Sequence, residues 1–283
     1  MKTDRRLWLK ALAASPLLLA LPAVADEDGL AAIRQRGRLR IAVYNDFPPY
    51  SMKGGKGIDA DLGRAIAEKL GLAPEIVGFN ADEDMNDDLR NMVWKGHYLG
   101  TQPADVMLHV PVDEHLARAN DKVRIFGAYH RESLALARKP ERVPALSGSA
   151  AVALEIFTRE KIGVETASLA DSFLLGVLNG RLRENVVHFA TVGEATQAFA
   201  KGELAAVLAP RAELEAGLKG QQGYALDTPK FAELKIDGWP LGMAVKAEEK
   251  ELAEAIAAAL ADLKRDGTVA AIFKRHGISH LPA

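Results

Sequence analysis

Polar and aromatic side chains gather at the ends of predicted strands, where a ligand cleft would draw its walls. Tyr44, Asp46 and Tyr50 flank the end of a strand predicted over residues 39–43, which Pro48-Pro49 cannot continue. These three side chains either face a cleft or pack the loop around the prolines. His109 lies at the end of a strand predicted over residues 104–110, where it either hydrogen-bonds a ligand or packs inside.

A second group of candidates lies around and beyond these strands. Glu165, Thr166 and Ser168 follow a strand predicted over residues 161–164, so that Thr166 or Ser168 either caps the next helix or contacts a ligand. Arg118 and Arg211 could bind an anion through a planar guanidinium, or lie on the surface and along a helix. The ligand-binding candidates are therefore Tyr44, Asp46, Tyr50, His109, Arg118, Glu165, Thr166, Ser168 and Arg211.

Acidic residues and histidines are frequent, but their spacing does not predict a metal site. The acidic run over residues 82–88 lacks the spacing and the central glycine of an EF-hand loop, so a solvated helix N-terminus explains it better. No histidine pair has helical metal-site spacing with a carboxylate base. We therefore expect no metal and no cofactor; the histidines considered are His97, His109, His115 and His130.

The composition is that of an ordinary globular protein. The chain has 283 residues, no cysteine, 48% apolar residues and a formal net charge of -2. This charge gives no indication of a nucleic-acid surface, and a chain of this length can bury a core without disulfides. We expect a monomer.

The first 25 residues have the pattern of an export signal. A basic start is followed by an apolar run over residues 12–21 and by Ala23-Val24-Ala25, the small residues that a signal peptidase reads. The run is too short to span a bilayer, so we expect cleavage after Ala25 and no stable membrane anchor. Arg5-Arg6 is also compatible with a twin-arginine (Tat) signal, which leaves the general (Sec) and Tat routes open. Both routes predict a periplasmic protein.

Strands and helices alternate in two similar blocks, one before and one after residue 140. In the first block a strand over 39–43, a helix from 57 to 70 and a strand over 74–79 form a βαβ unit, with Asp59 as the expected helix N-cap. The second block begins with the strand over 161–164. Two βα blocks predict two α/β lobes with a cleft between them.

Three segments in the expected order resemble the bacterial extracellular solute-binding protein family 3. They are Gly57-Ile58-Asp59-Ala60-Asp61-Leu62, the opening strand and loop over 39–50, and the closing helices over 246–277. The resemblance implies an α/β, two-lobed periplasmic binding protein of type II (Venus-flytrap) with two hinge crossovers. Lobe 1 would comprise residues 26–130 and 228–283, and lobe 2 residues 131–227. It further implies a non-enzymatic protein that binds a small molecule and delivers it to an ABC permease.

The amino-acid binders of that family carry two groups that this sequence lacks at the expected places. An arginine after the fourth strand of lobe 1 clamps the α-carboxylate, whereas Arg118 here has a different spacing. An aspartate after a lobe 2 strand holds the α-ammonium, whereas the strand over 205–209 here runs into Pro210-Arg211 with no carboxylate. We therefore expect a small polar solute other than a free α-amino acid.

Two alternatives remain open at this point. Residues 87–100 and 103–111 resemble a branch of the family associated with PQQ-dependent alcohol dehydrogenases, which implies an accessory protein that docks on a periplasmic quinoprotein dehydrogenase. A dehydratase-type enzyme shares the same fold. That activity requires an acid–base pair in the cleft, for which Glu165 and His109 are the candidates.

Overall fold

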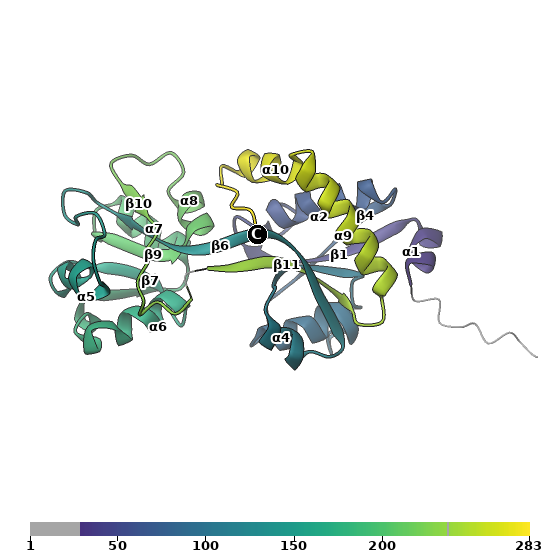
Figure 1. Cartoon of the computed structure of the whole chain (residues 1–283), viewed down its shortest axis with the longest axis horizontal. Coiled ribbons are helices and arrows are strands. Elements are labelled where there is room, and N and C mark those ends of the chain that lie inside the picture. Colours follow the sequence, from purple (N-terminus) through teal and green to yellow (C-terminus); the bar gives the residue numbers. More distant parts are fainter. Residues whose placement is uncertain (1–28, 237) are drawn as a thin grey trace, which may run out of the picture.

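The computed structural model describes residues 29–236 and 238–283. The predicted export signal, residues 1–25, lies outside the described residues. Two α/β halves lie side by side along the long axis of the molecule (Figure 1). Within the part of the chain that the structure describes, no helix has the length and apolar character needed to cross a bilayer.

The first half is built on a sheet whose parallel strands run in the order β4-β1-β5. Alternate residues of β1 face opposite sides: Leu39 and Ile41 enter one apolar cluster and Ala42 another. The first cluster packs under α2, α9 and α10, and the second under α3 and the π-helix η1. The bounds are α1 (Leu30–Arg36), β1 (Arg38–Tyr44), β2 (Asp46–Phe47), β3 (Ser51–Met52), α2 (Ile58–Lys69), β4 (Ala73–Phe79), α3 (Met85–Leu89), η1 (Arg90–Trp94), β5 (Val106–Pro111), α4 (Glu114–Ala119), α9 (Lys250–Arg265) and α10 (Thr268–His276).

The second half repeats this arrangement with a smaller sheet, in which β9, β7 and β8 are parallel. It has its own two apolar clusters, one on each face of the sheet. The bounds are α5 (Ala150–Ala153), η2 (Glu155–Thr158), β7 (Ile162–Glu165), α6 (Leu169–Gly176), η3 (Val177–Gly180), η4 (Arg183–Asn185), β8 (Val186–Phe189), α7 (Val192–Ala200), β9 (Ala206–Pro210), α8 (Arg211–Gly217) and β10 (Ala225–Asp227).

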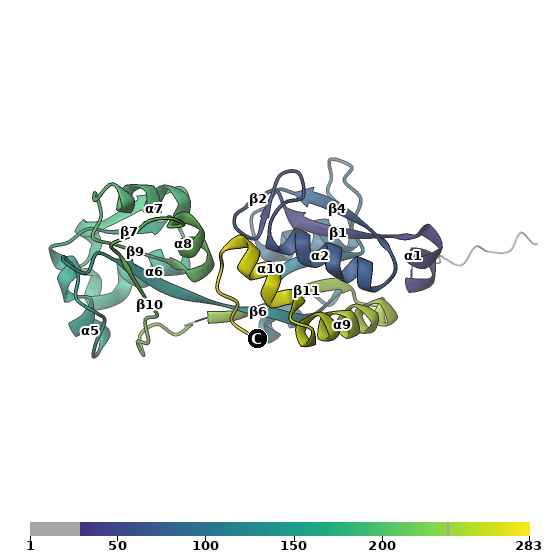
Figure 2. The same ribbon diagram turned by 90° about the horizontal axis from the view of Figure 1, so that it is seen from above.

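Two antiparallel strands, β6 (Val123–Arg138) and β11 (Gly238–Lys246), connect the halves. β6 pairs with β11 in the first half and with β9 in the second, so that one sheet path runs β4-β1-β5-β11-β6-β9-β7-β8. The C-terminal end of the chain lies beside this connection in both views (Figures 1 and 2). The apolar clusters of the second half also include Phe231 and Leu234, which follow the predicted lobe boundary at residue 227.

Two local features differ from the sequence prediction. Gly57, not Asp59, is the N-cap of α2; its φ is +113°, and a Cβ there would lie 2.3 Å from the Tyr50 carbonyl oxygen. Asp59 is instead fully buried within the first turn. A strand that the sequence also predicts, over residues 132–137, begins earlier, at Val123, because pairing with β11 extends β6 toward its start.

Candidate functional site

A cavity of about 370 Å³ lies between the two halves, at the carboxyl ends of β1 and β7. Its wall on the first half is the β2 segment with the following proline. Its wall on the second half comes from the end of β7, the start of α7, and both the first turn and the last residues of α8. The lining residues are Asp46, Phe47, Pro48, Glu165, Thr191, Val192, Gly193, Glu213, Ala216 and Gly217.

Phe47 stands between this interlobe cavity and a second one of about 470 Å³ in the first half. The second cavity is lined by Tyr44, Asp46, Phe47, Asn80, Ala81, Met85 and His109. The Phe47 ring packs edge-on against His109 at 4.7 Å between centroids and stacks on Tyr50 at 5.9 Å. Asp46 and Phe47 line both cavities, so a ligand could contact the same two side chains from either side.

His109 reaches the second cavity through an irregularity in β5. The pairing of β5 with β11 shifts at this point, so that Leu108 and Val110 have partners while His109 is the extra residue. Its φ is +63°, a conformation that a residue with a side chain rarely adopts. The His109 Nδ1 lies 3.1 Å from Asp59 Oδ2, and Tyr129 donates its hydroxyl to Asp59 Oδ1 at 2.6 Å. The buried Asp59 thus fixes the orientation of the imidazole from below the cavity.

Two glutamates, Glu165 and Glu213, line the second-half wall of the interlobe cavity, and a third, Glu132, is buried nearby on β6. Burial, with the neighbouring charges of Glu165 and Glu132, raises the pKa of Glu213 to about 8. Burial raises the pKa of Glu165 as well, although the Val192 N–H opposes that effect. Burial also raises the pKa of Glu132, whose carboxylate accepts the Tyr50 hydroxyl at 2.5 Å. The carboxyl of Glu213 therefore carries a proton at neutral pH while the cavity holds no positive charge.

Several predicted residues lie at the cavities, and others do not. Asp46 and Glu165 line the interlobe cavity, and Tyr44 and His109 line the second. Tyr44 is buried and donates its hydroxyl to Asp88; burial, together with the Asp88 carboxylate, raises the pKa of the Tyr44 phenol. Tyr50 is 1% exposed and packs in the core behind Phe47.

The remaining candidates have structural partners. Thr166 donates its hydroxyl to the Phe189 carbonyl, and Ser168 is the N-cap of α6, the capping role that the sequence offered. Arg118 projects from α4 with a 67% exposed side chain and pairs with Glu114. Arg211 begins α8 and lines a separate cavity near the C-terminal end.

Sequence reasoning missed Glu213, Phe47 and the start of α7. The strand over 205–209 has no carboxylate directly after it in the sequence, because Pro210-Arg211 follow. The first turn of α8 nevertheless carries Glu213 back to the cavity, three residues after Pro210. The signal in the sequence is a carboxylate within one helical turn of the strand end, and not only directly after it.

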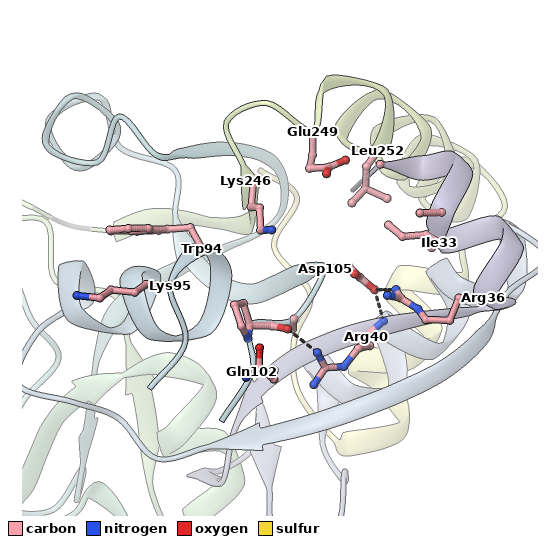
Figure 3. Close-up of a pocket in the computed structure, with 14 residues that line it drawn as sticks. Ile33, Arg36, Arg40, Trp94, Lys95, Gln102, Asp105, Lys246, Glu249 and Leu252 are labelled. Atoms are coloured by element: carbon pink, nitrogen blue, oxygen red, sulfur yellow. Dashed lines mark hydrogen bonds and ion pairs between the residues drawn. The ribbon is translucent and has the colours of Figure 1, made fainter. Parts of the chain in front are cut away.

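A further cavity, of about 430 Å³, lies at the opposite end of the first half (Figure 3). Arg40 and Asp105 stand at the amino ends of β1 and β5, away from the strand ends where ligands bind in parallel α/β sheets. The Arg36 guanidinium and the Arg40 N–H both bind the Asp105 carboxylate, at 2.5 and 2.7 Å. These contacts occupy the Asp105 carboxylate and join α1 to the sheet.

Among residues 29–236 and 238–283, no group of three or more histidine, aspartate or glutamate side chains is arranged to hold a metal ion. The carboxyl groups among the residues that line the interlobe cavity are those of Asp46, Glu165 and Glu213. Lysine and arginine are absent from the described residues that line the interlobe and second cavities.

Solved structures share this architecture over almost the whole described chain. An ancestral cationic amino acid solute-binding protein matches with a TM-score of 0.67, at 19% identity, over 87% of this chain and 98% of its own. An arginine-bound amino acid ABC transporter substrate-binding protein from Streptococcus pneumoniae Canada MDR_19A matches with a TM-score of 0.60, at 18% identity, over 89% and 98%. The chain has the type II periplasmic binding protein fold.

An ancestral arginine-binding protein with this fold, solved with glutamine bound, is 26% identical to the chain, with a TM-score of 0.55 over 85% of this chain and 97% of its own. A curated relative, membrane-bound lytic murein transglycosylase F of Haemophilus influenzae (strain PittEE), is 27% identical over 143 residues. That match covers 50% of this chain and only 27% of the enzyme. No protein-family model matches the chain. In a type II binding protein, the carboxyl ends of β1 and β7 are the expected place for a ligand.

Proposed function

We propose that this chain is a periplasmic solute-binding protein that closes two lobes on a small polar solute with a positively charged group. The observation that carries the proposal is the position of Glu213, which lines the interlobe cavity next to Glu165; burial, together with Glu165 and Glu132, raises its pKa. A cationic group entering the cavity would favour the ionised form of Glu213 and gain a charge-assisted hydrogen bond.

The proposal takes the first half as lobe 1 and the second half as lobe 2, with β6 and β11 as the hinge. The separate apolar clusters of the halves support this division. Because Phe231 and Leu234 pack in the second half, we place the end of lobe 2 after Leu234 instead of at residue 227. Export through the segment ending at Ala25 and delivery of the solute to an ABC permease complete the proposal.

The ligand that we propose lacks an α-carboxylate. A free amino acid needs a cationic partner for that group, and Arg118 is exposed and paired with Glu114 instead. Glu165 and Glu213 offer carboxyl groups that a cationic ligand would hold in their ionised form. A guanidinium or amine without a neighbouring carboxylate therefore fits this wall better than an amino acid does.

Agmatine and arginine form a matched pair of probes, because both carry a guanidinium and agmatine lacks the carboxylate. We expect agmatine, or another amine without a carboxylate, to raise the melting temperature more than arginine does. Ligand at 100 times its Kd would add about 2.7 kcal/mol to the free energy of unfolding. Glu213→Gln should reduce the effect, whereas Glu114→Gln, which removes an exposed carboxylate on α4, should not.

If neutral or anionic solutes stabilise the protein and no cation does, the acidic wall does not select the ligand. Calorimetric titrations in buffers of different ionisation enthalpy provide a second measurement. Binding of a cation at pH 7 should release close to one proton, because Glu213 is about 90% protonated beforehand.

A second candidate function, docking on a periplasmic quinoprotein dehydrogenase, is favoured by the exposed apolar residues after η1. Tyr98 is 87% exposed and Leu99 76% exposed, in the segment that resembles the dehydrogenase-associated branch. Co-purification with such a dehydrogenase, lost in Tyr98→Ser, would support this function. If no dehydrogenase is retained, the accessory role is excluded.

For catalysis, the structure separates the two residues that sequence analysis paired. Glu165 lines the interlobe cavity and His109 the second cavity, with Phe47 between them. We therefore propose binding without chemical conversion. One solved structure with this fold is an ancestral amino acid-binding protein that is a precursor of cyclohexadienyl dehydratase. Turnover of a cyclohexadienyl substrate by the present chain would therefore contradict the proposal of binding alone.

A further inference from the structure

The C-terminal tail, residues 277–283, lies beside the connecting strand β6 (Figures 1 and 2). Ile278 is buried in an apolar cluster of the first half. The Arg131 N–H donates to the Leu281 carbonyl at 2.8 Å, and the Leu281 N–H donates to His130 Nδ1 at 3.3 Å. The tail is therefore attached to the first half, just before β6 leaves its pairing with β11 and begins to pair with β9.

Packed rings strengthen this attachment. The His280 ring lies 4.8 Å from the ring of Phe273 and 5.7 Å from that of His130, measured between centroids. The His280 Nε2 also lies 2.8 Å from the Tyr129 carbonyl oxygen. Burial is the main cause that lowers the pKa of His130 to about 3. His130 is therefore neutral at physiological pH and keeps a lone pair that can accept the Leu281 N–H.

One hydrogen bond of the tail crosses from the first half to the second. The Ser279 N–H donates to Glu215 Oε2 at 2.7 Å, and Glu215 belongs to α8 of the second half. The Glu215 side chain is only 13% exposed, and its other carboxylate oxygen lies 3.4 Å from the Arg211 guanidinium. A bond from an N–H to an ionised carboxylate is stronger than one between neutral groups. The tail thus ties α8 directly to the first half.

The same helix also forms part of the interlobe cavity. Glu213, Ala216 and Gly217 of α8 line that cavity, whereas Ala212 is buried in an apolar cluster of the first half. Any rotation of the second half about the connecting strands displaces α8 relative to the tail. A hydrogen bond weakens steeply with small changes in distance and angle, so the bond between the tail and α8 holds only in this arrangement of the halves.

We propose that the C-terminal tail positions α8 for solute binding and thereby sets the affinity of the interlobe cavity. This inference rests on the proposed solute-binding function. The bond exists in the arrangement in which both halves line the cavity, so it favours that arrangement over those in which the halves are further apart. Ser279 and Glu215 act as positioning residues, because neither is among the described residues that line the cavity.

Two substitutions at one position separate the backbone donor from the side chain. Ser279→Pro removes the N–H and leaves the pair of Arg211 and Glu215 in place. Ser279→Ala keeps the N–H and removes only the hydroxyl of an exposed residue. In calorimetric titrations with agmatine, we expect the Kd of Ser279→Pro to be about three- to tenfold higher than that of the natural protein, because fewer molecules hold the competent arrangement. Ser279→Ala should bind as the natural protein does.

The distance between the halves provides a measurement that needs no solute. The sequence contains no cysteine, so pairs of introduced cysteines can be spin-labelled specifically. Lys53→Cys in the first half and Gln197→Cys in the second replace exposed residues. We expect Ser279→Pro to shift the distribution of distances between these labels toward longer values, and Ser279→Ala to leave it unchanged.

An unchanged or shorter distance in Ser279→Pro, or an equal change in Ser279→Ala, would overturn the proposal. A longer distance with unchanged agmatine affinity would also reject it, because the tail would then not act on the solute site. If Ser279→Pro does not fold, Glu215→Ala removes the same bond from the side of α8 and decides by the same measurements. If agmatine binds to no form of the protein, the proposed function fails, and the distances alone decide whether the tail holds the halves together.

Discussion

Replacement of Glu213 by glutamine should make the protein more stable at alkaline pH, with little effect in acid. The native carboxyl has a pKa of about 8 and the unfolded one about 4.5. Between these values the native state binds more protons than the unfolded state, so the free energy of unfolding falls as pH rises. Glutamine keeps the shape of the side chain without the titration.

The structure sets the size of this effect. The full difference between the two pKa values corresponds to about 5 kcal/mol at pH above 8. Glu213 lines a cavity that water enters, and its side chain is only partly buried, which reduces the expected gain to about 2 kcal/mol. Below pH 4.5 both states of the natural protein are protonated and the two proteins should be equally stable.

Urea unfolding at pH 5, 7 and 8.5, in the absence of added solute, measures this difference. Glu114→Gln serves as the control, since the same chemical change on the exposed α4 should leave the dependence on pH intact. Glu132 and Glu165 also have raised pKa values, so Glu213→Gln should retain part of the slope. Equal slopes for the natural protein and Glu213→Gln, or a less stable variant at pH 8.5, would refute the reasoning.

Three further substitutions test the positions that shape the site. Gly57→Ala should reduce the free energy of unfolding by about 2 to 4 kcal/mol, because φ is +113° and a Cβ would meet the Tyr50 carbonyl oxygen; an unchanged urea midpoint would contradict the tight turn. Tyr129→Phe should cost about 1 to 3 kcal/mol by the same measure, because it leaves a buried oxygen of Asp59 without its donor; a neutral effect would indicate that water replaces the hydroxyl. Phe157→Ala, at a fully buried position of the second half, should cost about 3 to 5 kcal/mol, and a loss below 1 kcal/mol would mean that the surrounding core collapses into the space.

The sequence predicts helices and strands well where the apolar periodicity and the glycines at the ends of the elements indicate the same bounds. The strand over 39–43 and the helix from 57 to 70 correspond to β1 and α2, and the closing helices over 246–277 correspond to α9 and α10. Periodicity fails for the first part of β6, over residues 123–131, because polar and apolar residues there follow no single period. Pairing with β11, more than a hundred residues later, forms that segment.

The candidate site was predictable in its location but not in its chemistry. Asp46 and Glu165 follow buried strands and lie at the cavity, as strand-end reasoning requires. Asp59 has the residue type and place of a helix cap, yet Tyr129, seventy residues away, draws its carboxylate into the core. The pKa of Glu213 likewise depends on burial and on the nearby Glu165 and Glu132, all of which only the folded chain provides.

The pairing of β6 with β11 has a consequence for protein engineering. Ser133 lies opposite Gly238 in neighbouring antiparallel strands, so the points where the chain leaves and re-enters the first half are adjacent. A short turn joining these two residues would convert β6 and β11 into a hairpin and delete the whole intervening polypeptide. The remaining sheet would keep its strand order, which makes the first half a natural host for transplanted second halves and for inserted reporter domains.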